Sequence, residues 1–347
     1  MRNCKHHLAF IAIVVLVISG SVIPVASARN IVLKIATIAP EGQTWMNMMH
    51  QAADEVTRKT DGRVRFKFYP GGVMGDNKAV LRKIRIGQLH GGMVTSGSLV
   101  SSFPDNQIYN LPITFHSFEE VDFVRGHMDQ IIADGLREGG FVTFGLAEGG
   151  FAYIMSKAPI RSAKDLHQHK IWVPEEDPIA VATARSFGVA PIPLSIAEVR
   201  TALQTGLIDT VAISPYPAIV LQWHTQVDYI TDIPLIYLYA VLAVDRRVFD
   251  KISPADQQIV TVCLSRVFKE IGRINREENI KALETLRNQG VLFVKPNKTE
   301  LQEWARLAET VPRRMVESGS LSQDILDKFE KYLKDYRSKG PASDGKS

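Results

Sequence analysis

Two stretches of sequence decide the fold: VLRKIRIGQLHGGMV at residues 80–94 and EVRTALQTGLIDTVA at residues 198–212. Each has the pattern of a helix that ends at a glycine, followed by one turn and a short buried strand. Further strands and helices alternate around both stretches in the same order. Because alternating strands and helices form parallel sheets with helices on both faces, this repeat predicts two α/β units.

The elements around the two stretches predict one cleft between the units. A strand at 31–37 is followed by Pro40-Glu41, and a strand at 171–173 is followed by Pro174-Glu175. Helical periodicity recurs in four segments, 45–60, 76–86, 179–187 and 197–205. Ligands of open α/β sheets bind beyond the C-terminal ends of the strands, where both Pro-Glu pairs sit. Two lobes that face each other would therefore share a single ligand-binding cleft.

A long helix is expected after the second unit. Ser253-Pro254-Ala255-Asp256 is a capping sequence with proline at the first helical position, and apolar residues then recur at helical spacing as far as Gly290. A helix of about 36 residues is about 54 Å long, which exceeds one lobe, so it should bridge both. Shorter amphipathic helices follow from Thr299, and the chain ends in a polar tail.

The first 28 residues contain the three parts of a cleavable secretory signal. Arg2 and Lys5 precede an apolar run at 8–18, and Ala26-Ser27-Ala28 ends the segment. The apolar run is too short for a membrane-spanning helix, which needs about 20 apolar residues. We expect cleavage after Ala28 and a mature protein in the periplasm. Retention of the segment as an N-terminal anchor is the alternative.

Charge and cysteine content exclude some classes of protein. Loss of residues 1–28 leaves 39 basic against 37 acidic residues, and no basic block is present, so nucleic acid is not an expected partner. Cys263 is the one cysteine of the mature chain, so no intrachain disulfide can form. Its position on the inner face of the long helix is typical of a small buried hydrophobe.

The sequence carries no motif for catalysis: HExxH, GxSxG, CxxC and the P-loop lysine pattern are all absent. The glycine-rich segment 70–75 could cradle an anion, but without GK[ST] it is more typical of a strand-to-helix turn. Glu175, Glu176 and Asp177 could bind a cation, but acids at a helix start more often complement its dipole. We therefore predict a non-enzymatic protein without cofactor or metal. An enzyme on the same fold and a signalling receptor domain are the rival interpretations.

Five short motifs are specific when taken together. They are FYPGG at 68–72 with Gly75, Leu111-Pro112 with Phe115, Ser156-Lys157-x-Pro159-Ile160 with Asp165-Leu166, Lys170-Ile171-x-Val173-Pro174, and ALQTG at 202–206 with Asp209. With them, the chain resembles the DctP-like solute-binding proteins of tripartite ATP-independent periplasmic (TRAP) transporters over about residues 31–334. The resemblance implies a two-lobed periplasmic-binding-protein fold of the α/β class with a hinge crossed twice and a long interlobe helix. It also implies one ligand enclosed between the lobes and delivery of that ligand to integral-membrane permease subunits.

The resemblance fails at three positions where relatives carry polar groups for an organic acid. Trp172 stands where an arginine usually clamps the carboxylate, Ala152 replaces a second arginine, and Ile213 replaces an asparagine. A carboxylate in a dry cleft without a cation loses hydration with little return, whereas apolar walls favour apolar ligand surface. The sequence therefore predicts an apolar or amphipathic small-molecule ligand. The alternative is a carboxylate held by a relocated cation such as Arg85 or Arg200.

The expected ligand-binding residues come from the ends of the predicted strands and from the three altered positions. They are Glu41, Trp45, Met74, Thr95, Ser96, Phe151, Ala152, Trp172, Pro174, Glu175, Asp177, Ile196, Ile213, Tyr216 and Tyr239. The expected first lobe is 29–151 plus 241–281, the second is 152–240 plus 282–332, and 333–347 is the polar tail. Segments 40–45, 81–89 and 172–175 look like the subgroup that works with a periplasmic tetratricopeptide-repeat protein, for which hydrophobic ligands have been proposed.

Overall fold

The computed structural model describes residues 30–339. The expected signal peptide and its cleavage site after Ala28 lie outside these residues. Within residues 30–339, no helix combines the length and the apolar character that crossing a membrane requires.

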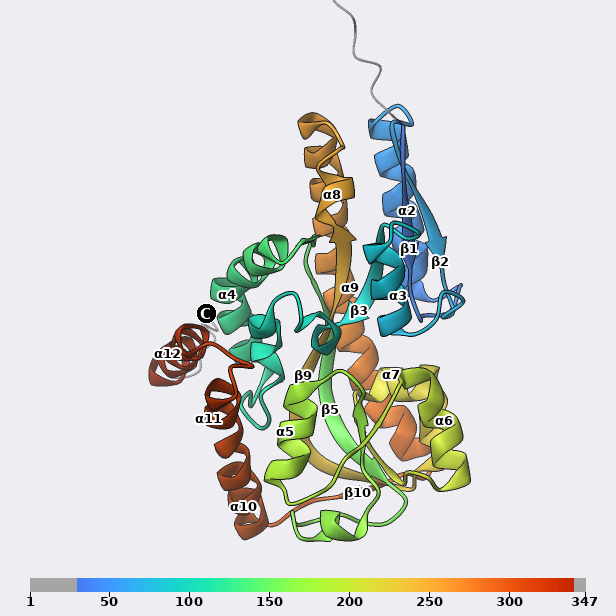
Figure 1. Ribbon diagram of the computed structural model, residues 1–347. Coiled ribbons are helices and arrows are strands. Elements are labelled where there is room, and N and C mark those ends of the chain that lie inside the picture. The colour runs from blue at the N-terminus through green and yellow to red at the C-terminus, as the bar shows by residue number, and fades with distance from the viewer. Residues whose placement is uncertain (1–29, 340–347) are drawn as a thin grey trace, which may run out of the picture.

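Eight strands of the described chain form one sheet in the order β2-β1-β3-β9-β5-β8, with β4 and β10 also paired to β9 (Figure 1). These strands are β1 Ile31–Ala36, β2 Val64–Tyr69, β3 Gly91–Thr95, β4 Phe141–Val142, β5 Leu146–Ser156, β8 Thr210–Ile213, β9 Tyr229–Asp245 and β10 Leu292–Val294. A second sheet pairs β6 Trp172–Pro174 with β7 Ile192–Leu194. The α/β class and the two-lobed architecture predicted from the sequence are confirmed by this arrangement and by the solved structures described below.

The prediction of purely parallel sheets is wrong for the centre of the fold. The pairs β1–β2, β1–β3 and β6–β7 are parallel as expected. In contrast, β9 is antiparallel to β3 and β5, and β5 is antiparallel to β8. Neither long strand is among the elements expected from the sequence, because the apolar run of β9 has no clear period of two to distinguish it from a buried helix.

The helices begin and end close to their local signals. They are α2 Thr44–Lys59, α3 Asn77–Arg85, α4 Phe118–Glu138, α5 Pro178–Ser186, α6 Ile196–Thr205, α7 Pro215–Val220, α8 Arg246–Phe249, α9 Pro254–Asn288, α10 Lys298–Ala308, α11 Thr310–Glu317 and α12 Gln323–Lys339. Asp76 caps α3 by accepting from the backbone N–H of Ala79, and Ser253 caps α9 by accepting from that of Asp256. Gly206 ends α6 with φ at +71°, a left-handed conformation that favours glycine.

Clusters of buried apolar side chains divide the chain into two lobes. The first lobe is built around β1–β3 and α2–α4, and the second around β6–β8 and α5–α7. The change of cluster falls within β5 between Phe151 and Ala152, and within β9 between Ile236 and Tyr237. The two strands are paired along most of this crossing, with register shifts between Glu148 and Gly150 and again between Ala152 and Ile154.

The third crossing is α9, whose 35 residues confirm the expected long interlobe helix. Ile271 packs in a first-lobe cluster and Leu286 packs in a second-lobe cluster. In Figure 1 the helix runs along one side of both lobes. Its apolar stripe therefore contributes to the core of each lobe.

The C-terminal segment differs from its expected assignment. From Val311 onward its buried residues pack in a first-lobe cluster rather than in the second lobe, since the apolar face of α12 covers α4. The expected polar tail also begins too early at residue 333. Leu333 is buried, and the Arg337 guanidinium donates to the Glu120 carboxylate at 2.8 Å.

Candidate functional site

A cavity of about 270 Å³ lies between the lobes. Its walls include Thr95 and Ser96 from the first lobe and Trp172, Ile196 and Ile213 from the second. Apolar side chains dominate the lining, and none of the described lining residues is a lysine, arginine or histidine. This composition can hold hydrocarbon or ring surface, but it offers no cation to a buried carboxylate.

Trp172 is a fixed part of the cavity wall. Its indole is almost fully buried and packs edge-to-face against Trp223, with ring centroids 5.1 Å apart. The indole Nε1 donates to the carbonyl oxygen of Leu194 at 3.0 Å. The side chain therefore has its own hydrogen-bond partner and presents apolar surface at the position where relatives were expected to carry an arginine.

The structure brings the three altered positions together on this one cavity. Ala152 lies on β5, Ile213 lies on the neighbouring strand β8 opposite Tyr153, and Trp172 lies on β6. Four more of the expected residues share the lining, namely Pro174, Asp177, Ile196 and Tyr239. With Thr95 and Ser96, nine of the fifteen expected residues therefore line this cavity.

Three expected residues lie on adjoining surfaces. Trp45 and Tyr216 line a hollow of about 220 Å³ beside the cavity, where the Tyr216 hydroxyl donates to Gln43 Oε1 at 2.9 Å. Glu175 lines the outer mouth of the cleft. The first two extend the apolar wall toward the long helix, and the third belongs to the solvent-exposed rim.

The other three expected residues, Phe151, Met74 and Glu41, do not line the cavity. Phe151 packs in the first-lobe core, 4.8 Å from the Phe118 ring, because successive strand residues point to opposite faces and Ala152 takes the cavity side. Met74 packs against the first-lobe core. Glu41 faces solvent and accepts from the ring of His50 at 2.9 Å.

Asp177 connects the two lobes, which the sequence did not reveal. Its carboxylate caps α5 through the N–H of Ala180 at 2.8 Å and accepts from Gln107 Nε2 at 2.6 Å. Gln107 belongs to η2, Pro104–Asn110, in the first lobe. Gly97 lies so close that an added Cβ would be 2.9 Å from Asp177 Oδ2. These contacts hold the second lobe against the first beside the cavity.

Two buried polar atoms near this contact have no hydrogen-bond partner among the described residues, Gln107 Oε1 and Thr183 Oγ1. Thr183 also lines the cavity. A ligand that donates a hydrogen bond could satisfy the threonine oxygen, which otherwise remains desolvated. Sequence reasoning missed both residues, because nothing local marks a glutamine or threonine as buried without a partner.

The Asp177 carboxyl predicts a pH effect on stability. Burial raises its pKa above the ordinary aspartate value, against the opposing effect of the N–H donors. The folded protein therefore binds this proton more tightly than the unfolded chain, so the contribution to stability is greatest at low pH and is lost as pH rises through the raised pKa. Urea unfolding of wild type and Asp177→Asn from about pH 4 to about pH 8 checks this. The free energy of unfolding of wild type, relative to that of Asp177→Asn, should fall as pH rises. A difference that stays constant with pH would contradict this linkage.

The cavity continues into an outer mouth of about 400 Å³, which shares Ile38, Thr95 and Pro174 with it. Arg200 on α6 and Lys78 on α3 line this mouth, and neither side chain makes a hydrogen bond or ion pair within residues 30–339. Arg85 lies instead on a separate groove. Of the two relocated cations considered from the sequence, Arg200 is therefore the one beside the cleft.

The acids of the mouth do not form a metal centre. Asp76, Glu175, Glu176 and Asp177 all line it. Within the described residues no group of three or more histidine, cysteine, aspartate or glutamate side chains is placed to hold a metal ion. Two of the four acids, Asp76 and Asp177, are engaged as helix caps.

The fold and the site indicate the class of protein: two α/β lobes with an apolar cavity between them are typical of a binding protein. Residues 35–319 match the family described as bacterial extracellular solute-binding protein, family 7, or DctP. The chain therefore belongs to this family, the solute-binding proteins of TRAP transporters, which are not enzymes. Membership in a family of extracellular solute-binding proteins implies that the protein works in the periplasm. The permease subunits of a TRAP transporter are its expected partners.

Known relatives cover most of the chain. The uncharacterized protein YiiZ of Salmonella typhimurium is 27% identical over 283 residues, 78% of this chain and 84% of that protein. The 2,3-diketo-L-gulonate-binding periplasmic protein YiaO of Escherichia coli is 23% identical over 247 residues, 69% of this chain and 73% of that protein. A TRAP periplasmic solute-binding protein from Citrobacter koseri with bound D-glucuronate has a TM-score of 0.78 at 23% identity, covering 86% of this chain and 99% of its own. The sugar acid binding protein of Advenella mimigardefordensis in complex with galactonate has a TM-score of 0.81 at 17% identity, covering 88% and 99%.

Proposed function

We propose that this solute-binding protein captures an organic carboxylate with a substantial apolar body and delivers it to a TRAP permease. The observation that carries the proposal is the continuity between a cavity without cations and a mouth that holds the unpaired Arg200. The apolar body would fill the cavity, and the carboxylate would remain at the mouth. Closure of the lobes would then be a hinge motion that ligand contacts favour.

The relatives support the acid part of this proposal. The ligands in their names are 2,3-diketo-L-gulonate, D-glucuronate and galactonate, all sugar acids. They favour the carboxylate alternative of the sequence analysis over a ligand without an acid group. At these identities the structures establish the fold alone, so the ligand of this chain is argued from its own residues.

The residues of this chain support the apolar part. Among the described residues that line the cavity, Asp177 is the one carboxylic acid and none is a lysine, arginine or histidine, so a carboxylate placed there would meet another acid and no cation. Apolar ligand surface buried against Trp172, Ala152 and Ile213 contributes about 25 cal/mol per Å². The acids at the mouth also disfavour a ligand with several carboxylates, since Arg200 and Lys78 are the only cations among the described residues that line it.

A ligand panel tests the proposal by thermal shift and calorimetry. It compares an aryl-alkyl carboxylate, its uncharged amide and D-glucuronate. We expect the apolar acid to bind most tightly, and Arg200→Gln to weaken it about tenfold while leaving the amide unchanged. Arg161→Gln, an exposed arginine of the second lobe away from the mouth, is the matched control. Tighter binding of D-glucuronate would contradict the apolar body, and equal binding of acid and amide would contradict the carboxylate.

We also infer that delivery involves a periplasmic tetratricopeptide-repeat protein. Segments 40–45, 81–89 and 172–175 support this subgroup by resemblance. Affinity capture from periplasmic extract, with the captured proteins identified by mass spectrometry, is the direct test. Recovery of the permease subunits without a repeat protein would count against it.

A further inference from the structure

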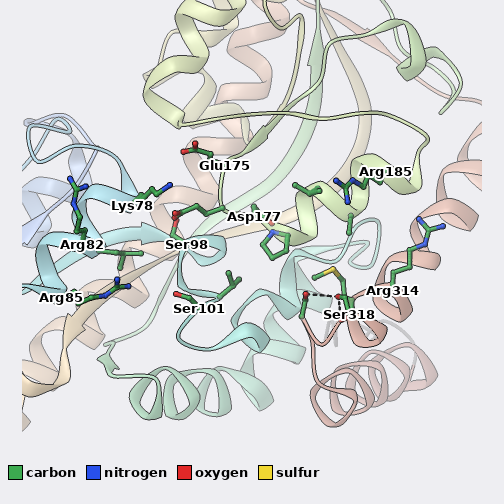
Figure 2. A pocket seen from close by; sticks show the side chains of 18 residues that line it. Lys78, Arg82, Arg85, Ser98, Ser101, Glu175, Asp177, Arg185, Arg314 and Ser318 are labelled. Atoms are coloured by element: carbon green, nitrogen blue, oxygen red, sulfur yellow. Dashed lines mark hydrogen bonds between the residues drawn. The ribbon is translucent and has the colours of Figure 1, made fainter.

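A groove of about 890 Å³ lies outside the ligand cavity, where both lobes meet the C-terminal segment (Figure 2). Its lining comes from α3 and from η1, Ser96–Leu99, in the first lobe, from α5 in the second lobe, and from α11. The groove and the mouth of the ligand cleft share the lining residues Lys78, Ser98, Glu175, Glu176 and Asp177, whereas the groove and the ligand cavity share Asp177. The groove is therefore a second recess at the interlobe boundary, distinct from the cavity of the proposed function.

Five cationic side chains line the groove. Lys78, Arg82 and Arg85 come from α3, Arg185 comes from α5, and Arg314 comes from α11. Figure 2 shows the three side chains of α3 on one side and Arg185 with Arg314 on the other. The five cations outnumber the three acids of the lining, so the groove carries a net positive charge.

None of these five side chains makes a hydrogen bond or an ion pair within residues 30–339. Arginines elsewhere behave differently: Arg313, the neighbour of Arg314, donates to Glu317 at 2.9 Å, and Arg337 donates to Glu120. Like charges that gather in excess of the nearby counter-charges repel one another. A bound anion would relieve this repulsion and accept charge-assisted hydrogen bonds from several guanidinium groups.

The rest of the lining adds hydroxyl groups and apolar side chains to the cations. Ser98, Ser101, Ser318 and Ser320 supply hydroxyl groups, and the Ser318 and Ser320 oxygens are 3.0 Å apart. Leu81 and the largely buried Met315 add apolar side chains to the lining. An anion with three or more acid groups carries several sets of acceptor oxygens, so it offers acceptors to the cations of both walls.

We propose that this groove binds a multiply charged small anion, of the tricarboxylate or oligophosphate class, that bridges the two lobes. An anion held by α3 of the first lobe and α5 of the second is bound best when the lobes are together. Its binding energy therefore stabilises the closed arrangement, and by linkage closure tightens its binding. The groove thus acts as a peripheral anion site coupled to lobe closure.

Thermal shift and calorimetry with citrate and with tripolyphosphate test the site, at constant ionic strength maintained with sodium chloride. The variants are Arg185→Gln and Arg314→Gln, with Arg313→Gln as a control that removes the same charge one residue away. We expect both anions to raise the melting temperature of wild type. Each groove variant should weaken binding about three- to fivefold, and the control should not. A preference for one anion identifies whether carboxylate or phosphate is the better match.

Bridging has its own test in a double-mutant cycle between Arg82→Gln and Arg185→Gln, which lie on opposite walls. If one anion contacts both walls, the two losses in affinity should be non-additive. Additive losses would overturn the bridging site. The site itself would be overturned if the anions raised the melting temperatures of wild type, Arg314→Gln and Arg185→Gln equally. It would also be overturned if the anions raised the melting temperature of wild type no more than chloride does.

Discussion

Replacing Gly97 by alanine is expected to weaken ligand binding by about tenfold to a hundredfold without unfolding either lobe, since overpacking costs about 1–3 kcal/mol. The added Cβ would lie 2.9 Å from Asp177 Oδ2, 3.0 Å from Cγ and 3.1 Å from Cβ. The aspartate is short, is fixed as the cap of α5 and is bound to Gln107, so it has little room to move. The methyl group would act as a wedge between the lobes beside the cavity.

Gly126→Ala provides the control, because a Cβ at Gly126 in α4 meets no atom within 4 Å. Calorimetry with the carboxylate that stabilises wild type most would measure affinity, and small-angle scattering of the liganded protein would measure closure. We expect the Gly97 variant to remain more open than wild type and the Gly126 variant to match it. Wild-type affinity in the Gly97 variant would show that the Asp177 contact is not part of the ligand-bound state.

Replacing Arg276 by methionine is expected to lower the free energy of unfolding by about 3 kcal/mol. This value is the lower end of the range for breaking a buried ion pair, because Arg276 is partly exposed to solvent. The Arg276 guanidinium on α9 donates to Glu148 at 2.6 and 2.9 Å and to Asp122 at 2.7 Å. Glu148 on β5 is buried, and without the arginine its carboxylate would retain, among residues 30–339, only the Tyr237 hydroxyl at 3.1 Å as a side-chain donor. The variant would thus leave a buried charge without its counter-charge.

Arg273→Met is the matched control one turn earlier on the same helix. Arg273 is exposed and pairs with Glu270, so its loss should cost less than about 1 kcal/mol. Urea unfolding of both variants gives the comparison. A further change of Glu148→Gln in the Arg276 variant should recover part of the stability, because it removes the unpaired charge. Equal stabilities of the two arginine variants would refute the role of the Glu148 pair.

Much of the fold could be predicted because its signals are local. The limits of α9 follow from the Ser253 cap and from the helix stop before Gly290, and the two lobes follow from a repeat of helix, glycine and strand. The apolar character of the cavity was also visible in the residues, since Ala152, Trp172 and Ile213 all line it. Each of these inferences depends on a motif or on a single position.

The rest depends on contacts between residues far apart in the sequence. Phe151 was misplaced because the face of β5 that meets the cavity is set by its pairing with β8 and β9. The bond from Gln107 to Asp177 joins positions 70 residues apart, and no local pattern marks either partner. The groove on α3, α5 and α11 likewise exists only once three separate helices pack together.

The crossing of β5 and β9 has a mechanical consequence. Two paired strands resist stretching and shear, because either motion breaks several ladder hydrogen bonds, but they bend more easily where the ladder is irregular. Register shifts at Glu148–Gly150 and Ala152–Ile154 concentrate the irregularity where the chain changes lobe. The connection between the lobes is therefore expected to bend elastically at this point and not to rotate freely. A membrane partner would then encounter an open and a closed arrangement of the lobes, related by bending about one axis. The stiffness of the two strands would set how often the protein without ligand adopts each arrangement.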